Sequence, residues 1–241
     1  MATGDDLKQR IQRGDIVIGV SAPIDATKSQ LEAILGKDDY GFVNTDSQHA
    51  AFNEERLAQF CAIAEELDIP VQFRIKNTHH TYLIGNLLDL GPLAIEVPLV
   101  NSAAVVDDAI ENFYYPQVGK RSWGGVARYG ITGREDRLTY ADWWNRRGIL
   151  CLQVETIHAV TNARQFAKPG VTCLTWGPAD LSFDLEAHPE HPFKTVDDCL
   201  QHVLKQIDGT DVKISFRSYD HTLRNKYIDQ GITVLMERPK P

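Results

Sequence analysis

The chain lacks the features that mark membrane, secreted and nucleic-acid-binding proteins. Its 241 residues contain no apolar run near the length of about 18 to 20 residues that crosses a bilayer. The first residues, MATGDDLKQRIQRGD, have no apolar core of the kind found in signal peptides. The formal net charge is −8, whereas nucleic acids and anionic membranes usually require a basic face. We therefore expect a cytoplasmic protein that binds neither nucleic acid nor membrane.

Cysteine is scarce, and several common catalytic motifs are missing. The four cysteines are far apart and form no CxxC pair, which is typical of reduced thiols packed as small hydrophobic residues. They are Cys61, Cys151, Cys173 and Cys199. No GxSxG, P-loop or GxGxxG sequence is present. No lysine at a strand end suggests a Schiff base, which disfavours catalysis through a covalent lysine imine.

The chain alternates between short apolar runs and stretches with helical periodicity. Each run has the length of a strand that is buried on both faces, as parallel strands are. The runs are 16–22, 41–46, 70–75, 94–100, 149–155, 171–177, 212–217 and 232–237. Between them, apolar residues recur at three- and four-residue steps in 53–67, 79–90, 102–112, 156–167, 195–208 and 219–230. Eight such units predict an α/β protein with one domain, 1–241, that folds as a (β/α)8 barrel.

Two segments depart from this regular pattern. The connection from about 113 to 148 is long and rich in Gly, Arg and aromatic residues. A long loop that follows a barrel strand is often a lid, so we expect one here. After the eighth run only 238–241 remain, which predicts that the eighth helix is missing. Either the segment Asp5–Arg13 or a neighbouring subunit is expected to cover that side of the barrel.

Polar residues close several of the apolar runs, where barrel enzymes carry their catalytic groups. Asp46 closes the second run, followed shortly by His49; Arg74 lies in the third, and Gln153 and Glu155 in the fifth. The sixth run ends in Trp176, Gly177, Pro178, Ala179 and Asp180. Charged groups are rarely buried unless they are paired or bound to metal. Their convergence at one end of the barrel therefore predicts a functional site.

Glu155 and Asp180 close consecutive strands, so their carboxylates are expected to meet. Ligation by oxygen atoms suits a hard cation such as Mg²⁺ or Mn²⁺, with positions left for water and a chelating substrate. The alternative is that each carboxylate caps a helix or pairs with an arginine. Gly177–Asp180 resembles a strand-to-helix turn whose free N–H groups can hold a substrate carboxylate, although an ordinary helix start has the same sequence.

Asp46 and His49 form a DxxH pair just after a strand. An Asp that orients a His is a common arrangement for a general base, although isolated pairs are more often structural. Arg74 can offer a forked donor to a developing enolate or a substrate carboxylate. The alternative role for Arg74 is a structural ion pair with Asp46 or Glu155.

In order along the chain, DxxH, FRI, LDLG, EVPLVNSA, YYPQVGKR, QVET and GPADLS resemble the HpcH/HpaI aldolase family over about residues 6 to 237. The resemblance implies a (β/α)8 barrel that assembles as a homo-oligomer, a hexamer or a trimer. It implies that Glu155 and Asp180 hold a divalent metal, that Arg74 contacts a pyruvyl group, and that His49 is the base, with Asp46 beside it. Gln153, Gly177, Pro178, Ala179 and Trp176 would then contact substrate.

The sequence departs from the family pattern at several positions. Gln48 stands where the family usually has Glu, Ser122 replaces a Gly, and Trp176 replaces an aliphatic residue. The function that the resemblance implies is a class II aldolase that joins pyruvate and an aldehyde, or cleaves the 4-hydroxy-2-oxo acid. Alternatives are decarboxylation of oxaloacetate or another use of the enolate at the same site, or a non-catalytic 2-oxo-acid-binding protein.

Overall fold

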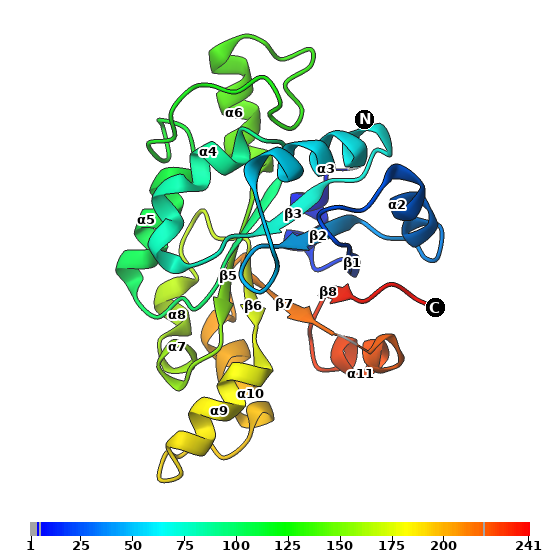
Figure 1. The fold of residues 1–241 in the computed structure, drawn as a ribbon. Helices are drawn as coiled ribbons and strands as arrows, with labels where there is room; N and C mark the ends of the chain where they lie inside the picture. The colour runs from blue at the N-terminus through cyan, green and yellow to red at the C-terminus, as the bar shows by residue number, and fades with distance from the viewer. Residues whose placement is uncertain (1–3, 5, 219) are drawn as a thin grey trace.

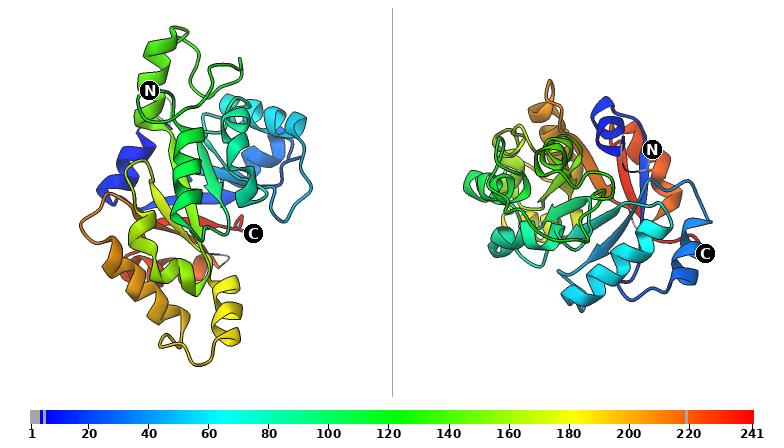
Figure 2. Two further views of the ribbon diagram at one scale, coloured as in Figure 1. Left: turned by 90° about the vertical axis from the view of Figure 1, so that its left-hand side faces the viewer. Right: turned by 90° about the horizontal axis from the view of Figure 1, so that it is seen from above.

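Eight short parallel strands close into a barrel in the computed structural model, which describes residues 4, 6–218 and 220–241 (Figures 1 and 2). Each strand pairs with the next in sequence, and β8 pairs with β1. The strands are β1 (Val17–Ser21), β2 (Phe42–Asp46), β3 (Val71–Arg74), β4 (Ala94–Val97), β5 (Ile149–Val154), β6 (Cys173–Trp176), β7 (Lys213–Arg217) and β8 (Val234–Glu237). The prediction of a single-domain (β/α)8 barrel is confirmed.

The strands are almost entirely buried, which explains why they are nearly continuous apolar runs. Their outer faces pack against the surrounding segments, as where Phe73 of β3 meets Phe52 of the loop after β2 at 5.0 Å between ring centroids. Their inner faces fill the barrel. Gly19 of β1 leaves room there for Phe42, because a Cβ at Gly19 would lie 2.2 Å from the Phe42 ring.

Helices surround the barrel, most of them where the periodicity predicts. They are α1 (Leu7–Arg13), α2 (Lys28–Leu35), α3 (Glu54–Glu66), η1 (Thr78–Leu83), α4 (Ile84–Leu88), α5 (Ala103–Phe113), α6 (Arg137–Arg147), α7 (Ile157–Thr161), α8 (Ala163–Phe166), α9 (Pro178–Ala187), α10 (Val196–Ile207), η2 (His221–Leu223) and α11 (Arg224–Asp229). Three predicted helices are each divided in two, namely 79–90, 156–167 and 219–230. Residue 219 itself lies outside the described residues. No helix in the described part of the chain is long and apolar enough to cross a membrane.

Helix α1 closes the amino-terminal end of the barrel. Leu7 and Ile11 line one small cavity together with residues from the starts of several strands, including Phe42, Val71 and Val234. The expectation that this segment replaces the eighth helix is therefore wrong, because its apolar face is buried against the barrel floor. Asp5, where that predicted segment begins, lies outside the described residues.

A cluster of ion pairs covers the outer side of β8 instead. Residues 238–241 follow β8 without helical structure and pass between α2 and α11 (Figure 1). Arg224 of α11 binds both Glu237 at 2.7 Å and Asp38 at 2.6 Å, and Lys240 also binds Asp38 at 2.7 Å. Glu237 is fully buried, so Arg224 supplies the charge that its carboxylate needs.

The long connection 114–136 and helix α6 lie at the end of the barrel away from the strand-end polar residues. This segment follows α5 and leads into β5, so α6 and α7 stand at opposite ends of β5 (Figure 1). Its core is Arg121, which packs between the rings of Tyr115 and Trp144 at 4.7 and 4.6 Å and pairs with Asp89 at 2.7 Å. The expectation of a lid is wrong, because the segment follows a helix rather than a strand.

Candidate active site

Arg74 and Asp46 form an ion pair at the carboxyl ends of β3 and β2. The strand register pairs the two residues directly. Arg74 donates from Nε to Asp46 Oδ1 at 2.8 Å and from Nη2 to Oδ2 at 2.6 Å. Burial disfavours the charged carboxylate of Asp46, but its bonds to Arg74 outweigh burial, so its pKa lies below the ordinary value. The guanidinium is thereby fixed at the rim of the barrel.

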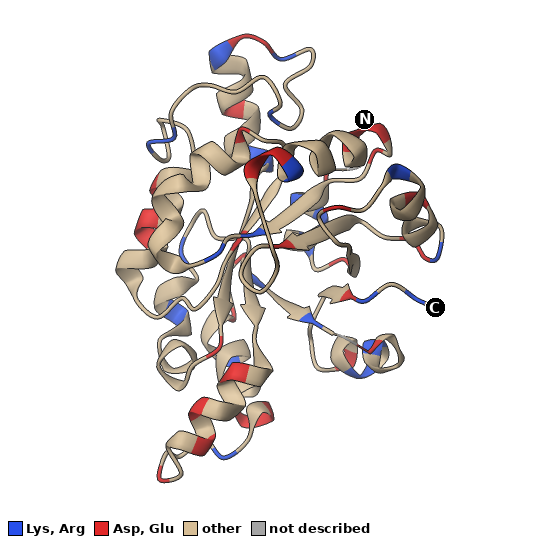
Figure 3. Ribbon diagram, viewed as in Figure 1, with Lys and Arg blue, Asp and Glu red and all other residues tan. Residues whose placement is uncertain are grey.

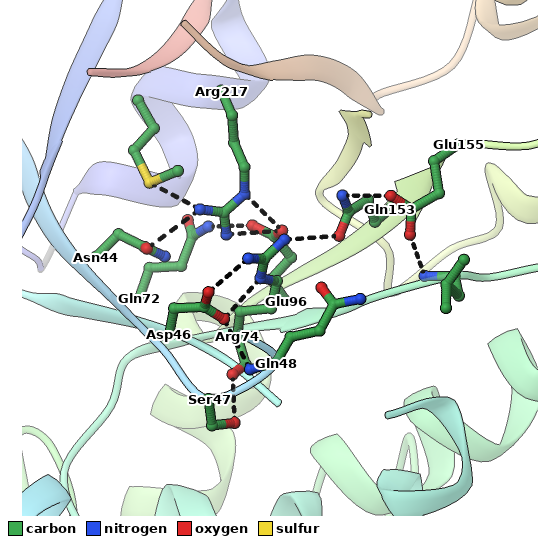
Figure 4. Close-up of polar contacts among 12 residues, drawn as sticks. Asn44, Asp46, Ser47, Gln48, Gln72, Arg74, Glu96, Gln153, Glu155 and Arg217 are labelled. Carbon is green, nitrogen blue, oxygen red and sulfur yellow. Dashed lines mark hydrogen bonds and ion pairs between the residues drawn. The ribbon is translucent and has the colours of Figure 1, made fainter. Parts of the chain in front are cut away.

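Gln153 connects this ion pair to Glu155. Gln153 lies in β5, and Glu155 directly follows the last residue of that strand. The side chain of Gln153 accepts from Arg74 Nη1 at 3.3 Å and donates from Nε2 to Glu155 Oε2 at 2.7 Å (Figure 4). Because both ends of this buried amide are used, Gln153 sets the relative positions of the arginine and the second carboxylate.

Glu155 is a buried carboxylate with a second carboxylate beside it. Burial and, to a smaller extent, the negative charge of nearby Asp180 raise the pKa of Glu155 to about 7, whereas the Leu99 N–H opposes the shift. That N–H donates to Oε1 at 2.8 Å. Leu99 has a φ of 50°, a left-handed conformation that is unfavourable for a leucine. The backbone after β4 is thus strained where it contacts Glu155.

The turn after β6 is shaped around Glu155. A Cβ at Gly177 would lie 2.6 Å from the Glu155 Cβ and 3.0 Å from Gln153 Nε2, so only glycine fits. Helix α9 begins at Pro178, and Asp180 lies in its first turn. The first amides of a helix have no partner within it and carry partial positive charge. The turn therefore offers N–H donors beside the two carboxylates.

A cavity of about 420 Å³ opens over these groups. Its lining is His49, Arg74, Gln153, Trp176, Gly177, Pro178, Ala179, Asp180, Phe216, Arg217, Asp220 and Tyr227. Most of the residues predicted from sequence therefore share one space. Asp46 and Glu155 lie directly beside it through their bonds to Arg74 and Gln153.

The relation predicted between Asp46 and His49 needs correction. The Asp46 carboxylate is bound by Arg74 and by the Gln48 N–H at 2.9 Å, and among the described residues it makes no hydrogen bond to His49. His49 is exposed at the cavity edge. Asp46 therefore forms the ion pair that was the alternative considered for Arg74. It orients Arg74 and does not set the tautomer of the His49 imidazole.

A second polar layer beneath the site was not predicted. Glu96 of β4 is fully buried, accepts from Gln72 Nε2 at 2.7 Å and pairs with Arg217 of β7 at 2.8 Å (Figure 4). Asn44 completes the layer. The sequence signal for it was the presence of Glu96 and Arg217 in two otherwise apolar runs, AIEV and ISFR. In Figure 3, charged residues lie at the centre of the barrel as well as on the outer helices.

The molecule has a larger cavity, of about 700 Å³, between α7 and α9. It is lined by Asn101, Thr156, Ile157, His158, Thr161, Asn162, Asp184, His188 and His191. None of the strand-end carboxylates faces it. The smaller cavity over Arg74 holds the reactive groups, and we take that one as the candidate active site.

The residues of this site fit a hard divalent cation. Within the described chain no group of three or more His, Cys, Asp and Glu side chains is placed to hold a metal. A closed structural zinc site is therefore not present among those residues. Glu155 is buried and the exposed Asp180 lies beside it, so their negative charges repel each other, and a cation between them would relieve that repulsion.

The chain is similar in sequence to known aldolases. The family model for HpcH/HpaI aldolase/citrate lyase matches residues 47–235. A hydroxypyruvate/pyruvate aldolase of Pseudomonas aeruginosa is 30% identical over 93% of this chain and 82% of its own length. A 2-keto-3-deoxy-L-rhamnonate aldolase of Klebsiella pneumoniae is 27% identical over 93% of this chain and 83% of its own.

A solved structure has the same fold. The HpcH/HpaI aldolase from Desulfitobacterium hafniense superposes with a TM-score of 0.79 at 24% identity, covering 96% of this chain and 89% of that one. At this identity the likeness shows the fold alone, whereas the matched family model shows which family the chain is related to. The chain therefore belongs to the HpcH/HpaI aldolase/citrate lyase family of carbon–carbon lyases.

Proposed function

We propose that this protein is a metal-dependent class II aldolase that cleaves or forms 4-hydroxy-2-oxo acids through a pyruvate enolate. The observation that carries the proposal is the pair Glu155 and Asp180, two carboxylates held together at the barrel rim without a neighbouring lysine or arginine between them in the described contacts. The aldolase names of the similar proteins support the same chemistry.

Glu155 and Asp180 would hold the cation, which we propose to be Mg²⁺ or Mn²⁺. Such an ion acts as a Lewis acid and stabilises negative charge on an oxygen of the substrate. Two protein carboxylates leave coordination positions for water and for a chelating 2-oxo acid.

The pyruvyl end of the substrate would lie between α9 and Arg74. The N–H groups that follow Gly177 and Pro178 would hold its carboxylate, because a helix N-terminus favours an anion. Ala179 and the buried ring of Trp176 would limit the space around it. Arg74 keeps its positive charge in a low-dielectric position, where it stabilises an enolate oxygen more strongly than it would in water.

His49 would act as the base, directly or through a water molecule. It removes the proton of the C4 hydroxyl group as the C3–C4 bond breaks. The electron pair of that bond moves to C3 and gives the enolate, while C4 leaves as an aldehyde. Protonation at C3 then yields pyruvate. The reverse sequence adds pyruvate to an aldehyde.

We further propose that the protein works as a homo-oligomer, a hexamer or a trimer, in the cytoplasm. The resemblance to the family supports this part of the proposal. Light scattering coupled to size-exclusion chromatography measures the assembly directly, and a monomer at working concentration would contradict this part of the proposal.

The test of the function is pyruvate release from a panel of 4-hydroxy-2-oxo acids and from oxaloacetate, with Mg²⁺ or Mn²⁺ and then with excess EDTA. The proposal expects metal-dependent release of pyruvate with an equal amount of aldehyde. Release from oxaloacetate alone, with carbon dioxide, would instead identify a decarboxylase. Tight metal-dependent binding of a 2-oxo acid without any pyruvate release would identify a binding protein.

A further inference from the structure

One side of the active-site cavity is formed by aromatic rings. Trp176 of β6 and Phe216 of β7 both line the cavity. They are partners in the strand register, so their side chains point to the same face of the sheet. Tyr227 of α11 packs on Phe216, with ring centroids 4.3 Å apart and an interplanar angle of 56°. We call Trp176, Phe216 and Tyr227 the aromatic wall.

The aromatic wall lies where the second half of the substrate would extend. The pyruvyl end would occupy the side of the cavity between α9 and Arg74. Apart from His49, the lining residues that remain come from β7 and the segment that follows it, namely Phe216, Arg217, Asp220 and Tyr227. Since all of them border the same cavity, the part of the substrate beyond C3 would run along the aromatic wall.

The charged groups beside the aromatic wall already have partners. Arg217 donates from Nε and Nη2 to Oε1 of the fully buried Glu96 at 3.1 and 2.8 Å. The Asp220 carboxylate accepts from the N–H and the hydroxyl of Thr222 at 2.9 and 2.6 Å. The charge of Arg217 is thus balanced by Glu96, and Asp220 would repel an acidic group. An apolar substrate group, in contrast, would gain by leaving water at this wall.

The three rings differ in how far the cavity reaches them. Trp176 and Phe216 are 2% and 6% exposed, so they form the base of the wall, whereas Tyr227 is only partly buried. Aromatic rings prefer offset or edge-to-face contacts with one another, so a substrate ring beside Tyr227 would continue the series. Trp176 also stands where the family usually has an aliphatic residue. This end of the wall therefore distinguishes the chain from the family pattern.

We propose that the aldehyde half of the substrate carries an aromatic ring, which packs against the aromatic wall. The substrate would then be a 4-hydroxy-2-oxo acid with an aryl group beyond C4. This inference rests on the proposed function, since it assigns the second half of the same substrate. The aromatic wall determines specificity by contact with a remote group and takes no part in the bond cleavage.

The experiment measures kcat/KM for the addition of pyruvate to three aldehydes. Phenylacetaldehyde and cyclohexylacetaldehyde have the same carbon skeleton and differ in aromaticity, whereas 4-oxobutanoate ends in a carboxylate. Tyr227→Leu removes the accessible ring of the wall, and Tyr227→Phe keeps the ring and removes only its hydroxyl. Tyr82→Leu is the matched control, because Tyr82 is 62% exposed and lies outside the cavity lining.

The wild type and Tyr82→Leu should prefer phenylacetaldehyde to both other aldehydes. In Tyr227→Leu the preference over cyclohexylacetaldehyde should fall about 2- to 10-fold, the effect of one aromatic contact, and Tyr227→Phe should retain it. Each preference is a ratio within one protein, so partial unfolding of a variant would not change it.

Three results would overturn the inference. The first is a wild type that prefers 4-oxobutanoate or treats the two ring aldehydes alike. The second is an unchanged preference in Tyr227→Leu. The third is an equal loss in Tyr227→Phe, which would assign the preference to the hydroxyl rather than to the ring.

Exchange of the pyruvate methyl protons into deuterated water, followed by NMR, separates this inference from the proposed function. Exchange requires enolate formation and no aldehyde. Metal-dependent exchange in the wild type, together with the preference for phenylacetaldehyde, supports the inference. Absence of exchange in the wild type would overturn the proposed function and the inference with it, whereas normal exchange without an aromatic preference would overturn the inference alone.

Discussion

Arg74 and Asp46 occupy paired positions on neighbouring strands and share two hydrogen bonds, at 2.8 and 2.6 Å. The bonds use one edge of the guanidinium and leave Nη1 directed toward Gln153. The pairing therefore fixes the orientation of the positively charged Arg74 guanidinium. Among the described residues, the histidine nearest in sequence, His49, makes no hydrogen bond to this carboxylate.

Asp46→Asn should therefore reduce kcat/KM for pyruvate formation about 10- to 100-fold, because a small displacement of a positioned charge has a large effect on the rate. Steady-state kinetics with metal at saturation measure the loss. Glu111→Gln, which breaks the exposed pair with Lys120, is the control and should leave the rate unchanged. An Asp46→Asn enzyme with normal kcat/KM would show that Arg74 needs no such support.

Gly177→Ala should impair the site while leaving the barrel folded. The new methyl group would lie 2.6 Å from the Glu155 Cβ and 2.7 Å from its Oε2, so the carboxylate must move. We expect affinity for Mn²⁺, measured by calorimetry or electron paramagnetic resonance, to fall at least about tenfold, as it does when the groups that orient metal ligands are lost. Gly36→Ala is the matched control, since its nearest contact would be 3.4 Å from Glu32 O. Unchanged Mn²⁺ affinity in Gly177→Ala would argue against Glu155 as a ligand.

Lys8 should make stability depend on pH in the alkaline range. Burial lowers the pKa of Lys8 from 10.5 to about 8, so between these values the unfolded chain binds more protons than the folded one. Stability attributable to Lys8 should then rise as the pH increases from 8 to 10.5, by about 3 kcal/mol at most.

Urea unfolding of the wild type and Lys8→Met at pH 7 and pH 10 tests this. The free energy of unfolding of Lys8→Met, relative to that of the wild type, should be highest at pH 7, where the wild type buries a charged amine. The variant also loses the bond from Lys8 to the Tyr114 hydroxyl at 3.2 Å. The free energy of unfolding of the variant minus that of the wild type should be smaller at pH 10 than at pH 7. A difference that is independent of pH would contradict the low pKa of Lys8.

Arg224→Met should destabilise the protein through Glu237. The variant would leave the fully buried Glu237 carboxylate without its cation, and Asp38 would keep only its pair with Lys240. Breaking a buried pair in this way costs about 2 to 4 kcal/mol when the arginine is partly exposed. Urea midpoints compared with those of Lys28→Met, which breaks an exposed pair with Glu66, measure the effect. Equal midpoints for the two variants would mean that the ion-pair cluster does not stabilise the side of β8.

Much of this molecule could be predicted from its amino acids. Apolar runs of strand length, separated by stretches with helical periodicity, determined eight parallel strands, because a strand buried on both faces must be apolar throughout. Given that order, the carboxyl ends of the strands must meet at one end of the barrel. Arg74, Gln153, Glu155 and the turn after β6 were therefore predictable as neighbours before any coordinates.

Only the tertiary structure decided how the charges pair. Asp46 is close in sequence to His49 but binds Arg74, because neighbouring strands bring residues 28 positions apart into register. Glu96 and Arg217 are 121 positions apart and meet across the barrel interior, which no local pattern indicates. Likewise, the connection 114–136 resembles a lid in composition, yet it lies at the amino-terminal end because a helix precedes it. Local periodicity reports burial, whereas the partner of a polar group depends on strand register and barrel closure, which arise from the whole chain.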